Sequence, residues 1–577
     1  MSTTASYYQN VNPDLLARVP LDARHILEVG CGNGNFARAV LARQPQAAYV
    51  GVELFAQAAQ EAQGVLSHVV VGDVEQSATL KTLDQICDGQ SGGFDALVLG
   101  DVLEHLRDPW QVLAQLRERT VLGGTAVACV PNVAHWSLLQ QQLCGRWDYA
   151  EQGLLDRTHL RFFTLETLLD LFRHAGWTVV DAAPRVLWPE QTQAALKRFL
   201  PLAQALGRDP KLMQRDLSAF QWVVRAVNGP APAPLRVTAL SMKKTAGVSE
   251  ARIDYPLTAL ATRPGVRTLW RENALALPPG GQPGVVVLHR QFLNHPDMCR
   301  HVDALAQRGW VVVSDMDDDP HHWREFVDSG FYAYRGVHAV SVSTEPLAEM
   351  VRQWNPNVQV FGNAMLALPV RPERPLNQAQ PLRVFFGALN RGPDWDAVRD
   401  GVLAAVVELG QQVQWVVVHE RAVFDALPTE VSKEFYPTLA HDRYMQVLAS
   451  CDVALLPLND TPFNRLKSDL KLVECCAAGV VPVCSPVVYG DVPAHAEIAV
   501  LARTPQQWQQ ALLDLCRQPQ ELARRRALGL DYVKRQRMHS QQVTAREAWY
   551  RQLLAQQPVL EAQRQARVTD GVQSLPI

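Results

Sequence analysis

Short apolar runs of strand type alternate with longer helical patterns along nearly the whole chain. In its first part, such runs occupy residues 25–29, 48–54, 68–74, 94–101 and 125–132. Helical patterns such as FARAVLARQ and DPWQVLAQLRERT lie between them. This alternation is typical of parallel sheets with helices on both faces, so the sequence predicts an α/β fold.

The chain of 577 residues is too long for one core, since a domain typically takes about 150 residues. A helix at 165–176 and strands at 177–184 and 219–228 close the first series of elements. Two Pro-rich breaks then separate two further series, so we expect three doubly wound units, the last two forming a two-lobed module. The expected boundaries are 1–228, a linker at 229–236, 237–375, 376–560 and a polar, frayed tail at 561–577.

Composition restricts the compartment and the partners. The 55 basic and 58 acidic residues give a net charge of −3, which argues against nucleic acid as a partner. We find no secretory signal at the start and no run near the ~20 apolar residues of a membrane span. Ten cysteines without a CxxC pair are typical of free thiols in a reducing cytoplasm. The stretch 194–206 is suited to lie on a bilayer, but we expect it to pack against its own domain.

A glycine-rich turn, LEVGCGNGN, follows the first predicted strand. Gly30, Gly32 and Gly34 are spaced more tightly than the G-x-G-x-x-G fingerprint of dinucleotide sites, and the turn lacks the GK[ST] ending of a P-loop. Glu28 lies inside the strand, where a carboxylate suits a ligand with cationic groups better than a pyrophosphate. These features disfavour a nicotinamide-dependent dehydrogenase.

Carboxylates recur at the ends of the following strands, at the edge where open α/β sheets bind ligands. Glu53 ends the second strand, where it can accept hydrogen bonds from both hydroxyls of a ribose. Asp73 ends the third strand, where it can hold an adenine amino group. The motif GDVLEHLRDPW brings Asp101, Glu104 and His105 to the same rim, where Asp101 can also cap the next helix.

The motifs EVGCGNG, GVE, GDV and GDVLEHL, in this order at strand ends, resemble those of class I S-adenosylmethionine-dependent methyltransferases. The resemblance covers roughly residues 10–228, and PNVAHW and GLLDRTHLRFFT resemble bacterial methyltransferases of glycan and small-molecule biosynthesis. It implies a Rossmann-like methyltransferase domain with S-adenosylmethionine as cofactor. The residues that it assigns to the cofactor are Glu28, Gly30, Gly32, Gly34, Glu53, Asp73 and Asp101.

Two histidines are candidates for a general base in this domain. His105 lies beside the fourth strand, and His159 belongs to a polar stretch suited to line an acceptor pocket. An imidazole can take a proton from a hydroxyl near neutral pH. The alternatives are a structural role for either histidine, and methyl transfer without a base, because the reaction mainly needs an in-line approach.

A dense polar segment at 457–491, PLNDTPFNRLKSDLKLVECCAAGVVPVCSPVVYGD, lies between two predicted strands. We expect a loop followed by a helix that begins near Lys467. Backbone N–H groups, Ser468 and the charge of Lys467 or Lys471 can hold a diphosphate there. Glu474 follows these lysines at spacings of 7 and 3 on the same helix, where a nucleotide ribose would bind. The alternative is a solvated amphipathic helix.

This segment resembles the donor half of GT-B glycosyltransferases, especially retaining bacterial enzymes of family-four type, where a Lys and a Glu bind the nucleotide-sugar diphosphate and ribose. The resemblance covers roughly residues 265–545. FFGALNRGPDW resembles the first loop of that half, which brings Gly387, Asn390 and Arg391 near the donor. One departure is that the first acid of the usual E-x7-E pair has no clear match, and Lys467 takes its region.

The acidic run SDMDDDPHHW at 314–323 ends a predicted strand and has three interpretations. It can bind a divalent metal, form a capped solvated turn, or direct its acids to the acceptor hydroxyl. GT-B enzymes generally need no bound metal, so we expect no metal site and assign Asp315 and Asp318, with Asp317 as a further candidate, to the acceptor. His289 is another candidate for the cleft.

The two resemblances together imply a bifunctional cytoplasmic enzyme of glycan biosynthesis, such as surface polysaccharide assembly. One domain transfers methyl from S-adenosylmethionine, and the GT-B module transfers a sugar from a nucleotide-sugar donor to a saccharide or lipid-linked acceptor. A lipid-linked acceptor would bring peripheral contact with the inner face of the membrane. The alternatives are a glycosyltransferase with a non-catalytic S-adenosylmethionine-binding docking domain, and a protein that binds both ligands without chemistry.

Overall fold

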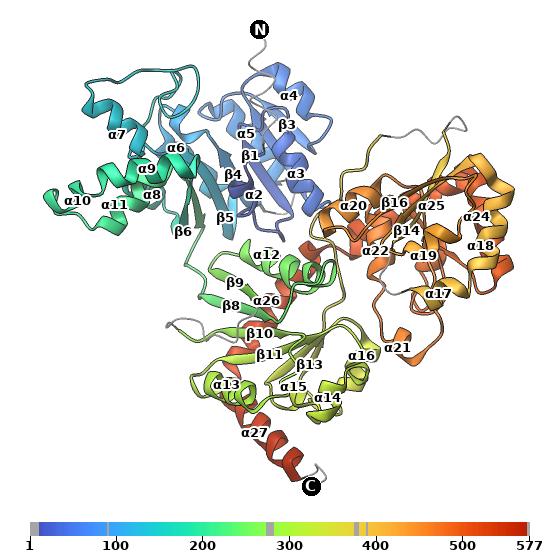
Figure 1. Ribbon diagram of the computed structural model, residues 1–577. Helices are drawn as coiled ribbons and strands as arrows, with labels where there is room; N and C mark the ends of the chain where they lie inside the picture. Colours follow the sequence, from blue (N-terminus) through green and yellow to red (C-terminus); the bar gives the residue numbers. More distant parts are fainter. Residues whose placement is uncertain (1–10, 89–91, 273–281, 374–379, 388–390, 574–577) are drawn as a thin grey trace. The chain divides into compact units, whose positions relative to one another are not determined.

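The computed structural model describes residues 11–88, 92–272, 282–373, 380–387 and 391–573, which contain three β-sheets with flanking helices (Figure 1). The predicted α/β fold class is confirmed. The chain divides into two compact units. The first comprises Met1–Pro234 with Ala261–Val266, and the second comprises Leu235–Leu260 with Arg267–Ile577. The boundary after Pro234 falls inside the segment where a linker is expected.

The first unit contains a seven-stranded sheet in the order β3-β2-β1-β4-β5-β7-β6. Its first five strands are parallel, and β7 is antiparallel to both of its neighbours. The strands are β1 His25–Val29, β2 Ala48–Glu53, β3 His68–Val71, β4 Phe94–Gly100, β5 Thr120–Pro131, β6 Thr178–Arg185 and β7 Gln221–Val227. All seven predicted strands of this unit are present, and β5 begins five residues before the expected position.

Helices cover both faces of this sheet (Figure 1). They are α2 Pro13–Leu16, α3 Asn35–Arg43, α4 Ala56–Ala62, α5 Ser77–Asp88, the 3-10 turn η1 Leu103–His105, α6 Pro109–Glu118, α7 Trp136–Leu143, α8 Leu165–His174, α9 Pro189–Phe199, α10 Leu202–Ala205 and α11 Pro210–Ser218. Alternate residues of each central strand enter different apolar clusters, Leu27 one and Ile26 the other. Both faces are therefore buried, which explains why these strands read as continuous apolar runs.

The stretch 194–206 lies in α9 and α10, and its apolar side chains pack within their own unit. Leu196, Phe199 and Ala203 are buried in a cluster that also contains Met213 and Leu217 of α11. None of the helices among the described residues is long and apolar enough to cross a membrane.

The second unit contains two sheets of six strands each, which we call the first lobe and the second lobe. The first lobe has the order β13-β12-β11-β10-β8-β9, and the second has β16-β15-β14-β17-β18-β19 with all neighbouring strands parallel. The strands are β8 Leu235–Ser241, β9 Val266–Glu272, β10 Val285–His289, β11 Val311–Met316, β12 Ala339–Val342, β13 Val358–Val360, β14 Leu382–Gly387, β15 Val413–Val418, β16 Ser432–Tyr436, β17 Val453–Leu456, β18 Val481–Cys484 and β19 Val500–Leu501. Two Rossmann-like sheets in succession are consistent with a GT-B module.

Helices connect the strands of both lobes. Those of the first lobe are the π-turn η2 Glu250–Asp254, α12 Tyr255–Ala261, α13 Pro296–Gln307, η3 Pro320–His322, α14 Arg324–Asp328, α15 Tyr332–Arg335 and α16 Glu345–Val351. Those of the second lobe are α17 Gly392–Asp396, α18 Arg399–Leu409, η4 Gly410–Gln412, α19 Arg421–Ala426, α20 His441–Ala449, α21 Pro462–Arg465, α22 Leu470–Ala477, α23 His495–Ile498, α24 Pro505–Arg517 and α25 Pro519–Gln536. The sheet order reverses between β14 and β17, and open α/β sheets bind ligands at such a reversal.

The C-terminal segment corrects one expectation. Residues 561–573, expected to be part of a frayed tail, belong to the long helix α27 Gln557–Gln573, which follows α26 His539–Ala555. They pack on the first lobe: the guanidinium of Arg564 pairs with Asp303 at 2.8 Å, and Gln563 accepts a hydrogen bond from Asn357 at 3.1 Å. The C-terminal helices thus belong structurally to the lobe that precedes them by some 200 residues of sequence.

A close helix contact in the second lobe generates a stability prediction. Helices α18 and α24 lie side by side (Figure 1), and a Cβ atom on Gly401 would fall far inside contact distance of the backbone oxygen of Pro505. We expect Gly401→Ala to destabilise the second unit, because overpacking against backbone costs ~1–3 kcal/mol and exceeds the ~1 kcal/mol gained in helix propensity. Calorimetry should show the transition of this unit falling by about 2–6 °C. Gly362→Ala, where nothing lies within 4 Å, is the matched control; equal shifts for both variants would contradict the packing argument.

Candidate active sites

The glycine-rich turn of the first unit connects β1 to α3 in a left-handed backbone. Gly30, Gly32 and Gly34 have φ angles of 73°, 54° and 82°, a region that glycine adopts without steric cost. At Gly30 a Cβ atom would also lie 2.8 Å from the side chain of Val102. The turn therefore needs glycine for its conformation and for its close approach to the segment after β4.

Glu53, at the end of β2, is tied to this turn. Its side chain is buried, one carboxylate oxygen accepts the N–H of Gly32 at 2.8 Å, and the other accepts the N–H of Phe55 at 2.9 Å. Backbone donors stabilise the ionised carboxylate, and each oxygen keeps a lone pair for a further donor. Glu53 is thus placed, as predicted, beside the glycine turn at the carboxyl end of its strand.

Glu28 lies deeper in the same unit than the sequence argument implies. Its carboxylate is buried and accepts a hydrogen bond from the hydroxyl of Tyr49 at 2.9 Å. Burial raises the pKa of Glu28 to about 8, against the opposing effect of the Tyr49 hydrogen bond and with a smaller contribution from the charge of Glu53. At neutral pH the ligand-free side chain is therefore mostly protonated, so the negative charge expected to attract a cationic ligand is largely absent.

The other two carboxylates assigned to the cofactor stand on the same rim. Asp73, after β3, accepts the N–H of Glu75 at 2.9 Å and pairs with the exposed Arg107 at 3.3 Å. Asp101, after β4, has a φ of 54° and accepts a hydrogen bond from the side-chain amide of Gln221. Burial raises the pKa of Asp101 to about 6. The side chain of Asp101 does not cap η1, whose first flanking residue is Val102, so the capping alternative is not supported.

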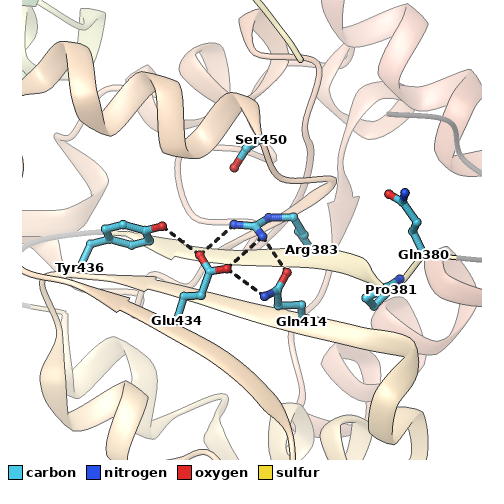
Figure 2. A pocket seen from close by; sticks show the side chains of 7 residues that line it. All are labelled: Gln380, Pro381, Arg383, Gln414, Glu434, Tyr436 and Ser450. Atoms are coloured by element: carbon cyan, nitrogen blue, oxygen red, sulfur yellow. Dashed lines mark hydrogen bonds and ion pairs between the residues drawn. The ribbon is translucent and has the colours of Figure 1, made fainter. Parts of the chain in front are cut away.

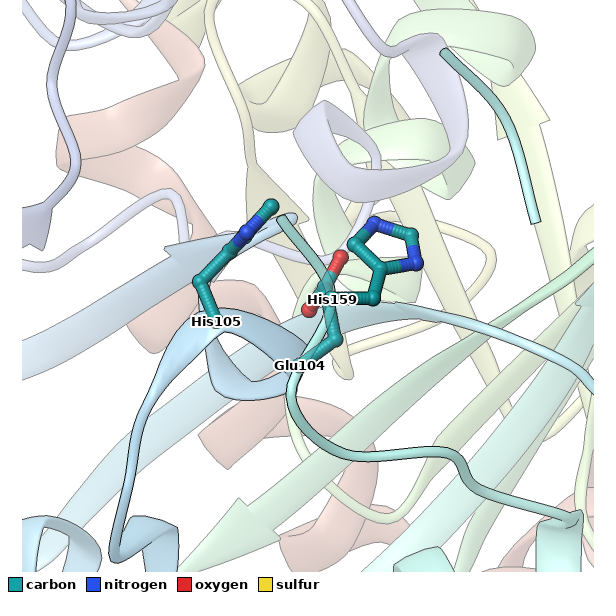
Figure 3. Close-up of side chains that lie close together, drawn as sticks. All are labelled: Glu104, His105 and His159. Carbon is teal, nitrogen blue, oxygen red and sulfur yellow. The ribbon is translucent and has the colours of Figure 1, made fainter. Parts of the chain in front are cut away.

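The structure brings the two candidate bases together. The imidazole rings of His105 and His159 lie 4.8 Å apart between centroids in an edge-to-face arrangement, and Glu104 completes the group (Figure 3). Burial, followed by the charge of His105, lowers the pKa of His159 and so favours its neutral form. The sequence predicted that Glu104 lies at the rim formed by the strand ends. Only the folded structure shows that it lies beside His105 and His159.

Three of the predicted donor-site residues meet in the second lobe. Lys471 donates to Glu474 at 2.9 Å and to the hydroxyl of Tyr444 at 3.1 Å, and that hydroxyl donates to the carbonyl oxygen of Gly387 at 3.0 Å. Burial lowers the pKa of Lys471, but the charges and hydrogen bonds of Glu474 and Tyr444 together outweigh this effect and leave that pKa raised, so the lysine is cationic. Tyr444 was not predicted as a site residue, because α20 carries no recognisable motif.

The group Gly387, Tyr444, Lys471 and Glu474, which we call the lysine cluster, includes the end of β14, where the sheet order reverses. Glu474 is buried, with 1% of its surface exposed, so a nucleotide would meet Lys471 before it reached the glutamate. Helix α22 begins at Leu470, three residues after the expected start. Asn390 lies outside the described residues, whereas the backbone N–H of Arg391 donates to Glu420 at 3.0 Å.

Lys467, Ser468 and Asp318 form a second polar group in the same unit. The ammonium of Lys467 pairs with Asp318 at 2.9 Å, and the other oxygen of Asp318 accepts from Arg290 at 2.8 Å. The hydroxyl of Ser468 accepts a hydrogen bond from Asn363 at 2.8 Å. Lys467 was expected at the donor and Asp318 at the acceptor. In the ligand-free protein these two residues are paired with each other.

Asp315 requires a correction. Its side chain is only 1% exposed, and its oxygens are bound by Arg252 at 2.6 Å, His289 at 3.1 Å and the hydroxyl of Ser341. The pKa of Asp315 is lowered, because the charge of Arg252 and the hydrogen bonds overcome the effect of burial. Asp315 and His289 thus form a buried ion-pair network and do not face an acceptor in this conformation.

A pocket of about 530 Å³ lies elsewhere in the second lobe, beside the first residues of β14 and β15 (Figure 2). Its polar groups satisfy one another: Arg383 binds Glu434 at 3.1 and 3.0 Å, and Gln414 and Tyr436 donate to the same carboxylate. None of the predicted site residues lines it. Because it opens near the beginnings of these strands, it is distinct from the lysine cluster at the end of β14.

Comparison with known proteins identifies the kind of domain at the N-terminus. A family model described as "Methyltransferase domain" matches residues 5–182. Trans-aconitate 2-methyltransferase of Azoarcus sp. (strain BH72) is 37% identical over 107 residues, which are 18% of this chain and 42% of the relative. The chain thus spans about two-fifths of the length of that relative. The first unit thus contains a region, residues 5–182, that matches a methyltransferase domain.

Solved structures show low similarity to either unit. HepE of Anabaena, in complex with UDP-glucose, is 14% identical and covers 54% of this chain and 99% of its own, with a TM-score of 0.40. A putative methyltransferase from Bacillus halodurans is 14% identical and covers 38% of this chain and 100% of its own, with a TM-score of 0.24.

The raised pKa of Glu28 generates a prediction about pH. Between about pH 5 and pH 8 the native carboxyl holds its proton while the unfolded one, with an ordinary pKa of 4.5, has lost it. The native state then binds more protons, so the free energy of unfolding should fall as the pH rises, by at most ~1.4 kcal/mol per pH unit. Glu28→Gln, which does not titrate, should remove this slope in ligand-free calorimetry, whereas Glu61→Gln on the exposed face of α4 should keep it. Parallel pH profiles for wild type and Glu28→Gln would rule out the assignment.

Proposed function

We propose that the protein is a bifunctional transferase of glycan biosynthesis. Its first unit transfers a methyl group from S-adenosylmethionine to a hydroxyl oxygen, and its second unit transfers a sugar from a nucleotide-sugar donor to a saccharide or lipid-linked acceptor. The carboxylate of Glu53 bound to the glycine turn supports the first activity, within a domain that matches a methyltransferase model. The lysine cluster at the sheet reversal is the observation that carries the second.

For methyl transfer, the described residues supply binding and orientation. Glu53 would accept the ribose hydroxyls, Asp73 would hold the adenine amino group, and the glycine turn lets the methionine part approach the backbone. The acceptor oxygen attacks the methyl carbon in line with the carbon–sulfur bond. A carbon–oxygen bond forms as that bond breaks, the electron pair stays on sulfur, and the hydroxyl proton passes to a ring nitrogen of His105 or His159.

For sugar transfer, the second unit would stabilise the leaving diphosphate. Lys471 supplies a fixed positive charge, and Lys467 would exchange Asp318 for a phosphate oxygen when the donor binds. The bond from the sugar carbon to the diphosphate oxygen breaks, the electron pair stays on the diphosphate, and the acceptor oxygen bonds to the sugar carbon. Asp318, released from Lys467, would then be free to take the acceptor proton.

A second candidate function keeps the sugar transfer but makes the first unit a docking domain that binds S-adenosylmethionine without using it. The protonated state of Glu28 favours this alternative, since it removes one expected attraction for a cationic ligand. Incubation of the full chain with S-adenosylmethionine and acceptor saccharides distinguishes the two. Formation of S-adenosylhomocysteine together with a methylated acceptor supports catalysis, and tight binding without either product supports docking.

Glu53→Ala should weaken the binding of S-adenosylhomocysteine about 10- to 100-fold, because a charged hydrogen-bond acceptor is worth ~1.5–3 kcal/mol. Isothermal titration measures this, and binding of nucleotide sugars should not change. Glu61→Ala, an exposed glutamate nearby on α4, is the matched control. Wild-type affinity in Glu53→Ala would remove the proposed cofactor site.

Glu474→Gln should reduce the affinity for the nucleotide sugar at least about 10-fold and leave S-adenosylhomocysteine binding intact. The amide keeps the shape of the side chain and a partner for Lys471, so the buried lysine is not left without an acceptor. A panel of UDP-, GDP- and ADP-sugars serves as the probe, with Glu497→Ala on the exposed face of the same lobe as control. If Glu474→Gln abolished both activities in a folded protein, the two-site model would fail.

A further inference from the structure

We propose that Glu104, His105 and His159 bind one divalent transition-metal ion of the Mn²⁺-to-Zn²⁺ series. One carboxylate oxygen and one ring nitrogen from each histidine lie within 4.8 Å of one another. The three side chains come from two separate segments, η1 and the turn that follows α7 in the chain, and they lie close together (Figure 3). We call this group the Glu–His–His site.

The carboxylate of Glu104 is the observation that most strongly indicates a missing partner. Only 1% of this residue is exposed, and neither carboxylate oxygen has a hydrogen-bond partner among the described residues. A buried and unpaired carboxylate is costly, and proteins pair it, hydrogen-bond it, keep it protonated or use it as a metal ligand. The two imidazoles beside Glu104 supply the further ligands that the last of these requires. Asp101 and Asp156 lie near enough to add negative potential at Glu104, so the surroundings favour a cation.

Hydrogen bonds already hold both imidazoles in the form that a metal ligand needs. The Nδ1 atom of His105 lies 3.2 Å from the carbonyl oxygen of Thr158, and the Nδ1 atom of His159 lies 3.2 Å from that of Leu154. A carbonyl oxygen can only accept, so each Nδ1 carries the hydrogen and each Nε2 keeps a free lone pair. Metal-binding histidines typically have such a second hydrogen bond, which fixes the ring.

The hydroxyl of Thr158 extends this support. It lies 3.1 Å from Nδ1 of His105 and donates to the carboxylate of Asp156 at 2.6 Å. The ring of His105 is thereby held by both the backbone and a side chain that is itself anchored by an acid. The arrangement is the outer layer expected around a ligating histidine.

The donor atoms indicate the class of ion. Two imidazole nitrogens with one carboxylate oxygen suit Mn²⁺, Fe²⁺, Co²⁺ or Zn²⁺, whereas Mg²⁺ and Ca²⁺ prefer all-oxygen ligand sets. Ligand atoms at ~2.0–2.2 Å from an ion lie about 3–4 Å from one another. The distances between the three donor atoms therefore need to shorten by about 1 Å when the ion binds. Three protein ligands leave at least one position open for an oxygen of another molecule.

The role of this ion rests on the proposed methyl transfer, whereas its binding does not. An acceptor hydroxyl in the open position would be acidified by the ion, and its proton would pass to water before or during attack on the methyl group. A ring nitrogen that holds an ion cannot take a proton at the same time. In the loaded protein the two histidines therefore act as ligands rather than as the general bases expected from the sequence.

Metal titration of the full chain tests the site without any need for activity. Protein stripped with a chelator is titrated with MnCl₂ and followed by the loss of the free-ion electron paramagnetic resonance signal, and Zn²⁺ is counted by mass spectrometry after dialysis. We expect one tightly bound ion per chain, and at least 10-fold weaker binding in Glu104→Gln, His105→Gln and His159→Gln. Glu166→Gln and His174→Gln, both on the exposed face of α8, should bind as the wild type does.

Equal metal binding by wild type and the three site variants would overturn the proposal, as would no binding to wild type. If Glu104→Gln fails to fold, as judged by circular dichroism, the two histidine variants decide by the same readout. Ion binding at this site in a protein that transfers no methyl group would uphold the site and refute the proposed methyl transfer. Unchanged methyl transfer by metal-free protein would overturn the role given to the ion.

Discussion

A carboxylate that leaves water has to be paired, hydrogen-bonded, protonated or bound to a cation, and this constraint governs every candidate site in the molecule. Both units bury carboxylates at or near strand ends, and each carboxylate is stabilised in a different way. Glu53 is held by backbone N–H groups, Glu474 by Lys471, Asp315 by Arg252, and Glu28 by a proton and Tyr49. The way in which each carboxylate is stabilised restricts the further interactions that it can make.

The chemical consequences follow from those partners. A carboxylate held by backbone donors can accept further hydrogen bonds, as a ribose site requires. A carboxylate paired with a lysine holds that lysine in place. Glu474 thereby fixes the positive charge of Lys471 in the lysine cluster. A carboxylate bound by arginine, histidine and serine in the core has no capacity left, and Asp315 is in that position. By contrast, the carboxylate of Glu104 has no hydrogen-bond partner in the described part of the chain.

Much of the fold could be predicted, because its strands are buried on both faces and therefore read as short apolar runs. The positions of Glu53, Lys471 and Glu474 followed from the same logic, since residues at the ends of parallel strands or on the next helix share one edge. Tyr444 could not be found this way, because it reaches Lys471 from a helix without a motif. Asp315 was misplaced because the acidic run suggests solvent, although this residue is still part of β11 and faces the core.

The helix in the predicted tail was missed for a different reason: a charged residue such as Arg564 of α27 becomes buried on folding, so its segment reads as polar. The path of the C-terminal helices has a mechanical consequence. Met365 donates its N–H to the carbonyl oxygen of Arg537 and accepts the N–H of His539, so the two stretches of chain that run between the lobes of the second unit are bonded together. Opening and closing of the two lobes would then rotate them about this pair of bonded segments. Sliding of one lobe past the other would break the two hydrogen bonds that join the segments.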